Sequence, residues 1–267
     1  MKMVDAHAHV FLEDMPHIAD PRHRITYGFT VEQYLKILDQ HGVERGVIAA
    51  ASPYGDYNDY TIAAVRNQPR LRGTVILEPT VERYVLEQMK KDGIVGVRLP
   101  FISLKQLPDL GSFEWQRTLR RIRDLDWHVH LHLDGPRLPA ILPALEACGV
   151  KLVVDHFGRP DPKLGVDCAG FQMMLRLLEN GRTWVKVSAA YRLGKENAAR
   201  YGRELLRRVG ADRLLWASDC PFVGHESQVK FQETIDDVLA WLPEGPEREK
   251  VFSANALAFY FQPVSGK

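Results

Sequence analysis

Short hydrophobic runs alternate along the chain with longer stretches of helical spacing. The runs are rich in valine, isoleucine and leucine, end in polar residues and are too short for helices, which is typical of strands buried in a parallel sheet. They occur at residues 3–9, 45–51, 71–77, 94–99, 128–133, 151–155, 183–188 and 214–218. The pattern therefore predicts eight strands.

The stretches between these runs predict amphipathic helices. In residues 30–41, the apolar side chains share one face, Thr30 is suited to cap the start, and Gly42 is suited to end the helix. Further helices are predicted at residues 57–67, 81–91, 115–125, 138–148, 170–180, 195–208 and 228–242, with a closing helix at 246–261.

The regular alternation of strand and helix predicts an α/β fold. Eight such units match a (β/α)8 TIM barrel, although an open doubly wound sheet uses the same local units. No linker or low-complexity tract divides the chain, so we expect residues 1–267 to form a single domain. Residues 11–29 form the longest segment without a clear element, and we expect either a wall or lid of a site or a packed surface loop.

Composition narrows the class of protein. The chain has 267 residues, is 45% hydrophobic, and carries 35 Lys and Arg against 34 Asp and Glu, a net charge of +1. Such a balance gives no overall field for nucleic acid or an acidic membrane, so the expected partner is a small molecule. The 3 cysteines are far apart, and we find neither a signal peptide pattern nor an apolar run of membrane-spanning length. These features predict a cytoplasmic protein.

Two histidines end the first predicted strand. Because side chains at positions i and i+2 of a strand point to the same face, His7 and His9 should converge on one point. In a (β/α)8 barrel that point lies at the C-terminal mouth, where catalytic groups gather. Their nitrogens are suited either to hold zinc or a similar ion, or to donate hydrogen bonds to a polarised oxygen.

Other predicted strands also end in polar residues. The fifth carries His128, His130 and His132 on one face; we expect the first two to fill the barrel interior and His132 to be a candidate metal ligand. His156 follows the sixth run and Asp219 the eighth. Polar groups at several strand ends are costly to bury without a role, and an aspartate beside imidazoles can move a proton between water and a leaving group.

Arginines stand at or after the ends of three of the same runs: Arg98 ends the fourth, Arg159 follows the sixth and Arg192 follows the seventh. Arg98, Arg159 and Arg192 should lie around one mouth, where guanidinium groups are suited to clamp substrate carboxylates. Ser52 and Tyr54, after the second run, are candidates for further hydrogen bonds to substrate.

Five short motifs carry these residues in order: VDAHAH at 4–9, GVR at 96–98, DHFGR at 155–159, WVKVS at 184–188 and LWASDCP at 215–221. Together they resemble the amidohydrolase superfamily, in particular the branch that includes 2-pyrone-4,6-dicarboxylate hydrolase and related lactonases. The resemblance implies a distorted (β/α)8 barrel. It also implies catalytic roles for His7, His9, His156 and Asp219, and carboxylate binding by Arg98, Arg159 and Arg192.

The resemblance leaves the metal content open. Two-metal members of the superfamily have a bridging carboxylated lysine at the end of strand four, where this chain has Arg98, so a binuclear centre is not expected. The pyrone hydrolase of this branch works without a divalent metal, whereas related lactonases and decarboxylases use one. One-metal members often supply a strand-five histidine, so we expect either no metal or one zinc ion held by His7, His9, His132 and Asp219.

The sequence thus leads to a hypothesis of lactone hydrolysis. A carboxylated lactone, such as a 2-pyrone-4,6-dicarboxylate, a muconolactone or a sugar-acid lactone, would be opened with Asp219 as general base. His7, His9 and His156 would polarise the carbonyl, with or without zinc. Two alternatives stay open: a metal-dependent decarboxylase or lactone isomerase on the same scaffold, and a non-catalytic binding protein.

Overall fold

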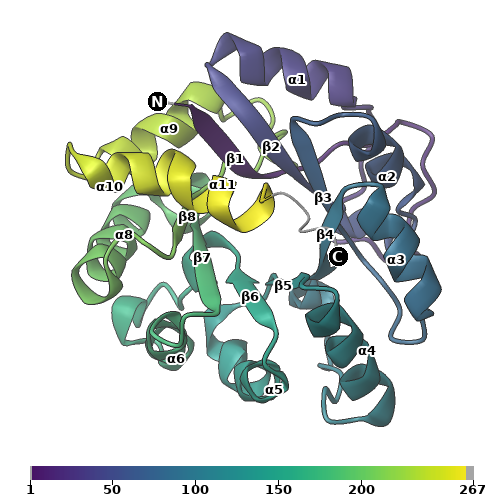
Figure 1. The fold of residues 1–267 in the computed structure, drawn as a ribbon. Coiled ribbons are helices and arrows are strands. Elements are labelled where there is room, and N and C mark those ends of the chain that lie inside the picture. Colours follow the sequence, from purple (N-terminus) through teal and green to yellow (C-terminus); the bar gives the residue numbers. More distant parts are fainter. Residues whose placement is uncertain (1, 263–267) are drawn as a thin grey trace.

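The computed structural model describes residues 2–262. Eight parallel strands lie side by side in the order of the sequence, and helices surround them (Figure 1). The strands are β1 (Met3–Ala8), β2 (Val43–Ala49), β3 (Leu71–Val75), β4 (Ile94–Leu99), β5 (His128–Leu131), β6 (Lys151–Val154), β7 (Thr183–Val187) and β8 (Leu214–Trp216). This arrangement confirms the predicted (β/α)8 barrel and excludes the open doubly wound sheet.

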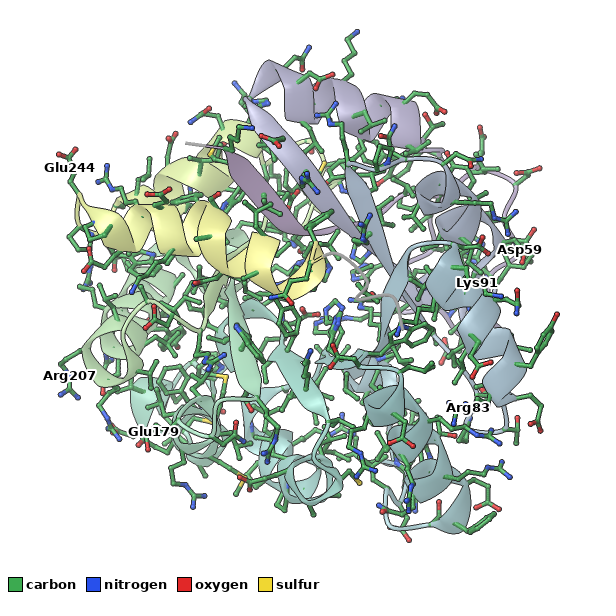
Figure 2. All side chains as sticks on the ribbon, in the orientation of Figure 1. Asp59, Arg83, Lys91, Glu179, Arg207 and Glu244 are labelled. Atoms are coloured by element: carbon green, nitrogen blue, oxygen red, sulfur yellow. The ribbon has the colours of Figure 1, made fainter. Side chains whose placement is uncertain are left out.

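The helices surround the strands, and most of them carry charged side chains on the faces that point away from the strands. They are α1 (Val31–Gln40), α2 (Asp59–Arg66), α3 (Arg83–Lys91), α4 (Phe113–Asp124), α5 (Leu142–Cys148), α6 (Ala169–Leu178), α7 (Ala190–Leu193), α8 (Lys195–Val209), α9 (Phe231–Leu239), α10 (Pro246–Glu249) and α11 (Asn255–Tyr260). Figure 2 shows labelled examples, including Arg83 and Arg207, pointing away from the barrel. Within residues 2–262, no helix has the length and apolar character needed to cross a membrane.

Helix α1 begins and ends where the sequence predicts. The Thr30 hydroxyl accepts a hydrogen bond from the Gln33 backbone N–H, and the Gln33 side chain accepts one from the Thr30 backbone, which together form a capping box. At the other end, Gly42 has a φ of 65°, in the left-handed region that glycine adopts without strain.

The helix predictions need correction at three places: one predicted helix is split, one is interrupted, and one observed helix was not predicted. The helix expected at 138–148 is split into a 3-10 turn, Gly135–Ala140, and α5, because Pro143 in the first turn of α5 has no N–H with which to continue the preceding turn. The closing helix expected at 246–261 is interrupted by a π turn, Lys250–Ala254. Helix α7, directly before α8, is absent from the prediction.

The barrel closes between β8 and β1 through irregular contacts. Strand β8 has only 3 residues, and the segment after it provides much of the connection. The Asp219 N–H donates to the His7 carbonyl at 2.9 Å. The Ser218 N–H and hydroxyl donate to the two carboxylate oxygens of Asp5 at 2.8 and 2.6 Å. The Asp5 side chain therefore takes the place of part of the backbone hydrogen-bond ladder between β8 and β1, and the barrel is distorted at this point.

The N-terminal end of the barrel is filled with apolar side chains. Inward residues of β1, β2, β6 and β8 pack against Ala256 and Tyr260 of α11. Figure 1 shows α11 lying across this end of the strands. Because α11 packs over the barrel interior at this end, the polar residues at the carboxyl ends of the strands open to the opposite, C-terminal side.

Candidate active site

A pocket at the C-terminal ends of the strands collects most of the predicted site residues. Its lining includes His9, Ser52, Arg98, His132, His156, Arg159, Arg192 and Asp219. Residues of the 11–29 segment, Arg22, His23 and Ile25, also line it, so this segment forms part of the wall. A much larger hollow at the other end of the barrel, around Trp184 and Phe259, contains none of these groups.

Four polar atoms converge at the floor of the pocket. The Nε2 atoms of His7 and His9 lie 3.1 Å apart. Asp219 Oδ1 lies 3.5 Å from His7 Nε2, 3.7 Å from His9 Nε2 and 3.8 Å from His156 Nε2. All four side chains are buried. The convergence of His7 and His9 follows from the strand alternation that predicted it.

Unusual backbone conformations orient the side chains that follow β6 and β8. His156, Arg159 and Asp219 have φ values of 48°, 45° and 65°, in the left-handed region that non-glycine residues rarely adopt. Backbone strain of this kind is held by the surrounding structure and clusters at functional sites. These turns bring residues of two strand ends to the same pocket.

Two donors hold the outer oxygen of Asp219. The Tyr191 hydroxyl donates to Oδ2 at 2.6 Å, and Arg192 Nε donates to the same oxygen at 3.0 Å. Oδ1 is therefore the oxygen that faces the histidines. Burial raises the pKa of Asp219, but the neighbouring His156 and Arg192 outweigh it and hold this pKa well below its usual range. At neutral pH the group is a carboxylate.

Two histidines that line the pocket, His9 and His156, are neutral at pH 7. Burial lowers the pKa of His156 to about 4, and its Nδ1 lies 2.8 Å from the Ser188 hydroxyl. Burial also lowers the pKa of His9, whose Nδ1 lies 2.7 Å from the Ala49 carbonyl oxygen. Because the Ala49 carbonyl can only accept, His9 carries its hydrogen on Nδ1 and offers a lone pair on Nε2. The Ser188 hydroxyl can donate or accept, so His156 can present either an N–H or a lone pair to a ligand.

The converging atoms also fit a single divalent ion. Zinc binds imidazole nitrogen and carboxylate oxygen in tetrahedral sites at about 2.0–2.2 Å, which places neighbouring ligand atoms roughly 3.3 Å apart. The separations among His7, His9 and Asp219 are close to this value, and these three residues form a candidate metal-holding group. The donor set is thus suited to one metal ion, and Arg98 occupies the C-terminal end of β4.

His132 lies beside this group and has a different neighbour. Arg98 Nη2 lies 3.4 Å from His132 Nδ1, and a guanidinium can only donate, so Nε2 is the nitrogen of His132 that carries hydrogen. The metal-holding groups found among residues 2–262 do not include His132. Its role as a metal ligand stays a prediction.

The predicted arginines lie around the pocket with distinct partners. Arg98 is buried and donates to the Ala50 carbonyl at 2.8 Å. Arg159 Nε pairs with Asp134 at 3.0 Å, and Arg192 pairs with Asp219. Arg22 was not predicted from the sequence, since no strand or helix periodicity marks its segment. It adds a fourth guanidinium to the same pocket.

The two substrate-binding candidates in the turn after β2, Ser52 and Tyr54, have different positions relative to the pocket. Ser52 lines the pocket. Tyr54 is buried behind it, packed against the rings of Phe11 and His17 at 5.8 and 5.0 Å. Substrate contact by either residue stays a prediction.

A second polar layer lies beneath the pocket, and sequence reasoning missed its role. Asp155 accepts a hydrogen bond from His130, and Lys186 Nζ lies 3.4 Å from Asp155 Oδ1. All three side chains are buried. A lysine within a buried, valine-rich strand was the signal that could have identified this layer, because an unpaired ammonium is costly to bury.

The chain matches the family model described as Amidohydrolase over residues 4–262. The chain belongs to this amidohydrolase family. As an amidohydrolase it is an enzyme, and the family assignment agrees with the barrel and with the histidine, aspartate and arginine residues at its mouth.

Similar proteins extend this amidohydrolase assignment over the full chain. A 4-sulfomuconolactone hydrolase of Hydrogenophaga intermedia is 28% identical over 98% of this chain and 89% of its own length. A 2-pyrone-4,6-dicarboxylate hydrolase of Comamonas testosteroni is 29% identical, with coverage of 97% and 90%. The crystal structure of a probable 2-pyrone-4,6-dicarboxylic acid hydrolase of Acinetobacter baumannii, with citric acid bound, has a TM-score of 0.92 and 32% identity, covering 97% and 99%.

Proposed function

We propose that this amidohydrolase hydrolyses the ring ester of a lactone that carries anionic groups. The observation that carries the proposal is one pocket in which a buried carboxylate and neutral imidazoles face four guanidinium groups. The named relatives act on such compounds: a pyrone dicarboxylate in one case and a sulfomuconolactone in another. The Acinetobacter structure holds citric acid, itself a polycarboxylate.

Asp219 is the proposed general base. It is ionised at neutral pH, and Tyr191 and Arg192 fix its orientation so that Oδ1 faces the histidines. Oδ1 removes a proton from water while the water oxygen attacks the lactone carbonyl carbon. The carbonyl electron pair moves onto oxygen, giving a tetrahedral intermediate with an oxyanion.

The imidazoles are the proposed stabilisers of this oxyanion. His156 lines the pocket and is neutral at pH 7, so with hydrogen on Nε2 it can donate to the developing charge. His9 presents a lone pair on Nε2 and therefore serves to hold the hydrogen of His7 or a metal ion. When the intermediate collapses, the ring C–O bond breaks and the leaving oxygen takes the proton from Asp219. The product is an acyclic acid, and Asp219 returns to its starting state.

The arginines are the proposed anchors for the substrate's anionic groups. Arg98 and Arg159 project from the ends of β4 and β6, and each has a buried guanidinium nitrogen without a hydrogen-bond partner among residues 2–262: Nε in Arg98 and Nη1 in Arg159. Buried donors of this kind are expected to be satisfied by a ligand or by water.

One divalent ion fits beside these groups. Held by His7, His9 and Asp219, it would act as a Lewis acid on the lactone carbonyl. His132 remains the proposed fourth ligand, a role that requires its Nε2 to give up the hydrogen that the contact with Arg98 places there.

The reaction is tested with carboxylated and sulfonated lactones in ¹⁸O-labelled water. The protein is treated with a chelator and then reloaded with zinc. We expect at least one lactone of the panel to give a product with one labelled oxygen in its carboxylate. Release of CO2, or a product of unchanged mass, would instead identify a decarboxylase or an isomerase. Binding without turnover across the panel would contradict the enzyme assignment for lactones.

Replacement of the base gives the sharper test. Asp219→Asn removes the proton acceptor and keeps the size of the side chain, so kcat should fall about 10²- to 10⁴-fold. The matched control is Asp126→Asn, at an exposed aspartate before β5, which should leave kcat unchanged. Circular dichroism checks that both variants fold. An Asp219→Asn protein with full activity would eliminate this residue as the base.

A further inference from the structure

Lys186 is a buried amine directly beneath the site, and no step above uses it. It lies on β7, is 0% exposed, and does not line the pocket. Its Nζ is 3.1 Å from His7 Nδ1 and 3.4 Å from Asp155 Oδ1. Burying an ammonium group is costly unless its hydrogens find acceptors, so the identity of those acceptors shows what the residue does.

The neighbours of His9 fix which of its nitrogens carries hydrogen. Its Nδ1 lies 2.7 Å from the Ala49 carbonyl oxygen, which can only accept, so the hydrogen is on Nδ1. The neutral ring then has a lone pair on Nε2. His7 Nε2 lies 3.1 Å from His9 Nε2. This contact is a hydrogen bond only if His7 carries its hydrogen on Nε2.

The Nδ1 atom of His7 has two competing neighbours. Lys186 at 3.1 Å can donate to it, and Asp155 at 3.3 Å can only accept from it. Donation by Lys186 requires a lone pair on Nδ1 and therefore places the hydrogen of His7 on Nε2. Donation to Asp155 requires the opposite tautomer.

The remaining members of the layer favour Lys186 in this competition. Asp155 already accepts a hydrogen bond from His130 Nε2, and the Thr74 hydroxyl lies 3.4 Å from His130 Nδ1. His130 therefore uses Nε2 as a donor and has no lone pair there for Lys186. Lys186 Nζ lies 3.0 Å from His130 Nε2, but that nitrogen carries hydrogen, and the lone pair on His130 Nδ1 is farther away at 3.5 Å. The nearest nitrogen that can accept from Lys186 is therefore His7 Nδ1, at 3.1 Å.

We propose that Lys186 is a positioning residue that holds His7 in the tautomer with hydrogen on Nε2. His7 then presents an N–H to His9 and Asp219 in place of a lone pair. A metal ion requires a lone pair on Nε2, so it can bind only if His7 transfers its hydrogen to Nδ1 and pairs with Asp155. Lys186 thus weakens metal binding at this site. The tautomer and the metal affinity do not depend on the lactone; only an effect on turnover rests on the proposed function.

The tautomer is measured directly by ¹⁵N NMR of protein with labelled histidine rings, treated with a chelator. The His7 signals are assigned by their loss in His7→Gln. We expect the wild-type ring to carry hydrogen on Nε2 and the ring in Lys186→Met to carry it on Nδ1. Lys186→Arg retains a donor and should keep the wild-type pattern. A wild-type ring with hydrogen on Nδ1, or no change in Lys186→Met, would refute the proposal.

Zinc affinity provides a second readout, independent of turnover. Competition with a chelating dye should give at least a tenfold tighter zinc affinity for Lys186→Met than for the wild type. Lys151→Met, which removes a lysine at the start of β6 that pairs with Asp126, is the control for loss of a distant positive charge and should change the affinity less than twofold. Equal affinities in Lys186→Met and the wild type would contradict the role. If Lys186→Met does not fold, Lys186→Gln serves the same comparison. Absence of lactone turnover would leave these results unaffected and would refute only the proposed reaction.

Discussion

Arg22 illustrates how a single residue outside the barrel can shape the pocket. It comes from the irregular segment between β1 and α1, yet it lines the same cavity as Arg98, Arg159 and Arg192. It forms no ion pair with any residue in the described part of the chain, 2–262, whereas Arg159 and Arg192 are paired with Asp134 and Asp219. Its guanidinium is therefore available to a ligand's anionic group.

Removing this charge should affect binding more than chemistry. For Arg22→Gln we expect KM for a lactone with two anionic groups to rise about 5- to 10-fold, with kcat changed less than twofold, because a partly exposed charge-assisted hydrogen bond contributes roughly 1 kcal/mol. Steady-state kinetics with dianionic and monoanionic lactones measure the difference. Arg24→Gln, two residues away and outside this pocket, is the control. A drop in kcat with unchanged KM would contradict an anchoring role.

At the scale of elements, close packing fixes where α6 begins. Gly170 lies in the first turn of α6, and a Cβ added there would overlap the Gly135 carbonyl oxygen. Gly135 in turn donates its N–H to the Arg159 carbonyl at 2.8 Å. The contact therefore joins α6 to the loop that carries a proposed anchor.

Gly170→Ala should destabilise the protein even though alanine is the better helix former. Helix propensity alone would favour alanine by about 1 kcal/mol, but the clash with a backbone atom should outweigh this and cost about 1–3 kcal/mol. Denaturant unfolding measures the difference in free energy. Gly28→Ala, where the nearest atom lies at 3.4 Å, is the matched control and should change stability little. A Gly170→Ala variant as stable as the wild type would disprove the packing constraint.

At the scale of the whole molecule, the closing seam between β8 and β1 depends on a buried carboxylate. Asp5 accepts hydrogen bonds from Ser218, from the Tyr34 hydroxyl and from the His7 backbone N–H. Burial raises the pKa of Asp5 to about 6, against the effect of these donors. The same seam carries the backbone of His7 and Asp219, so barrel closure and site geometry are linked.

Ser218→Ala should loosen this seam. Loss of the hydroxyl that donates to Asp5 should lower the unfolding free energy by about 2 kcal/mol, because a buried carboxylate loses one of its donors. Hydrogen exchange should increase in β1 and β8 and remain unchanged in β4. Ser112→Ala, at a helix start where the side chain makes no capping bond, is the control. Unchanged exchange in β1 and β8 would show that the backbone contacts alone close the barrel.

The sequence by itself determined the strands, most of the helices and the residues at the strand ends. Those features depend on local patterns. Buried strands are short and apolar, and polar residues such as His7, His9 and Asp219 mark the ends of strands at the C-terminal mouth of the barrel. The predicted helix at 138–148 missed the break before α5, although Pro143, which has no N–H, was a signal for it. Local patterns therefore predicted both the fold and the main residues of the pocket.

Only the tertiary structure decided which of these residues are partners. It placed Arg192 against Asp219 and Arg98 against His132, brought Arg22 to the wall, and placed Lys186 beneath His7. Each pairing joins residues distant in the chain, and neither periodicity nor spacing encodes such distances. The hydrogen position on a histidine depends on these neighbours, so the chemistry of this site was determined by barrel closure rather than by any single motif.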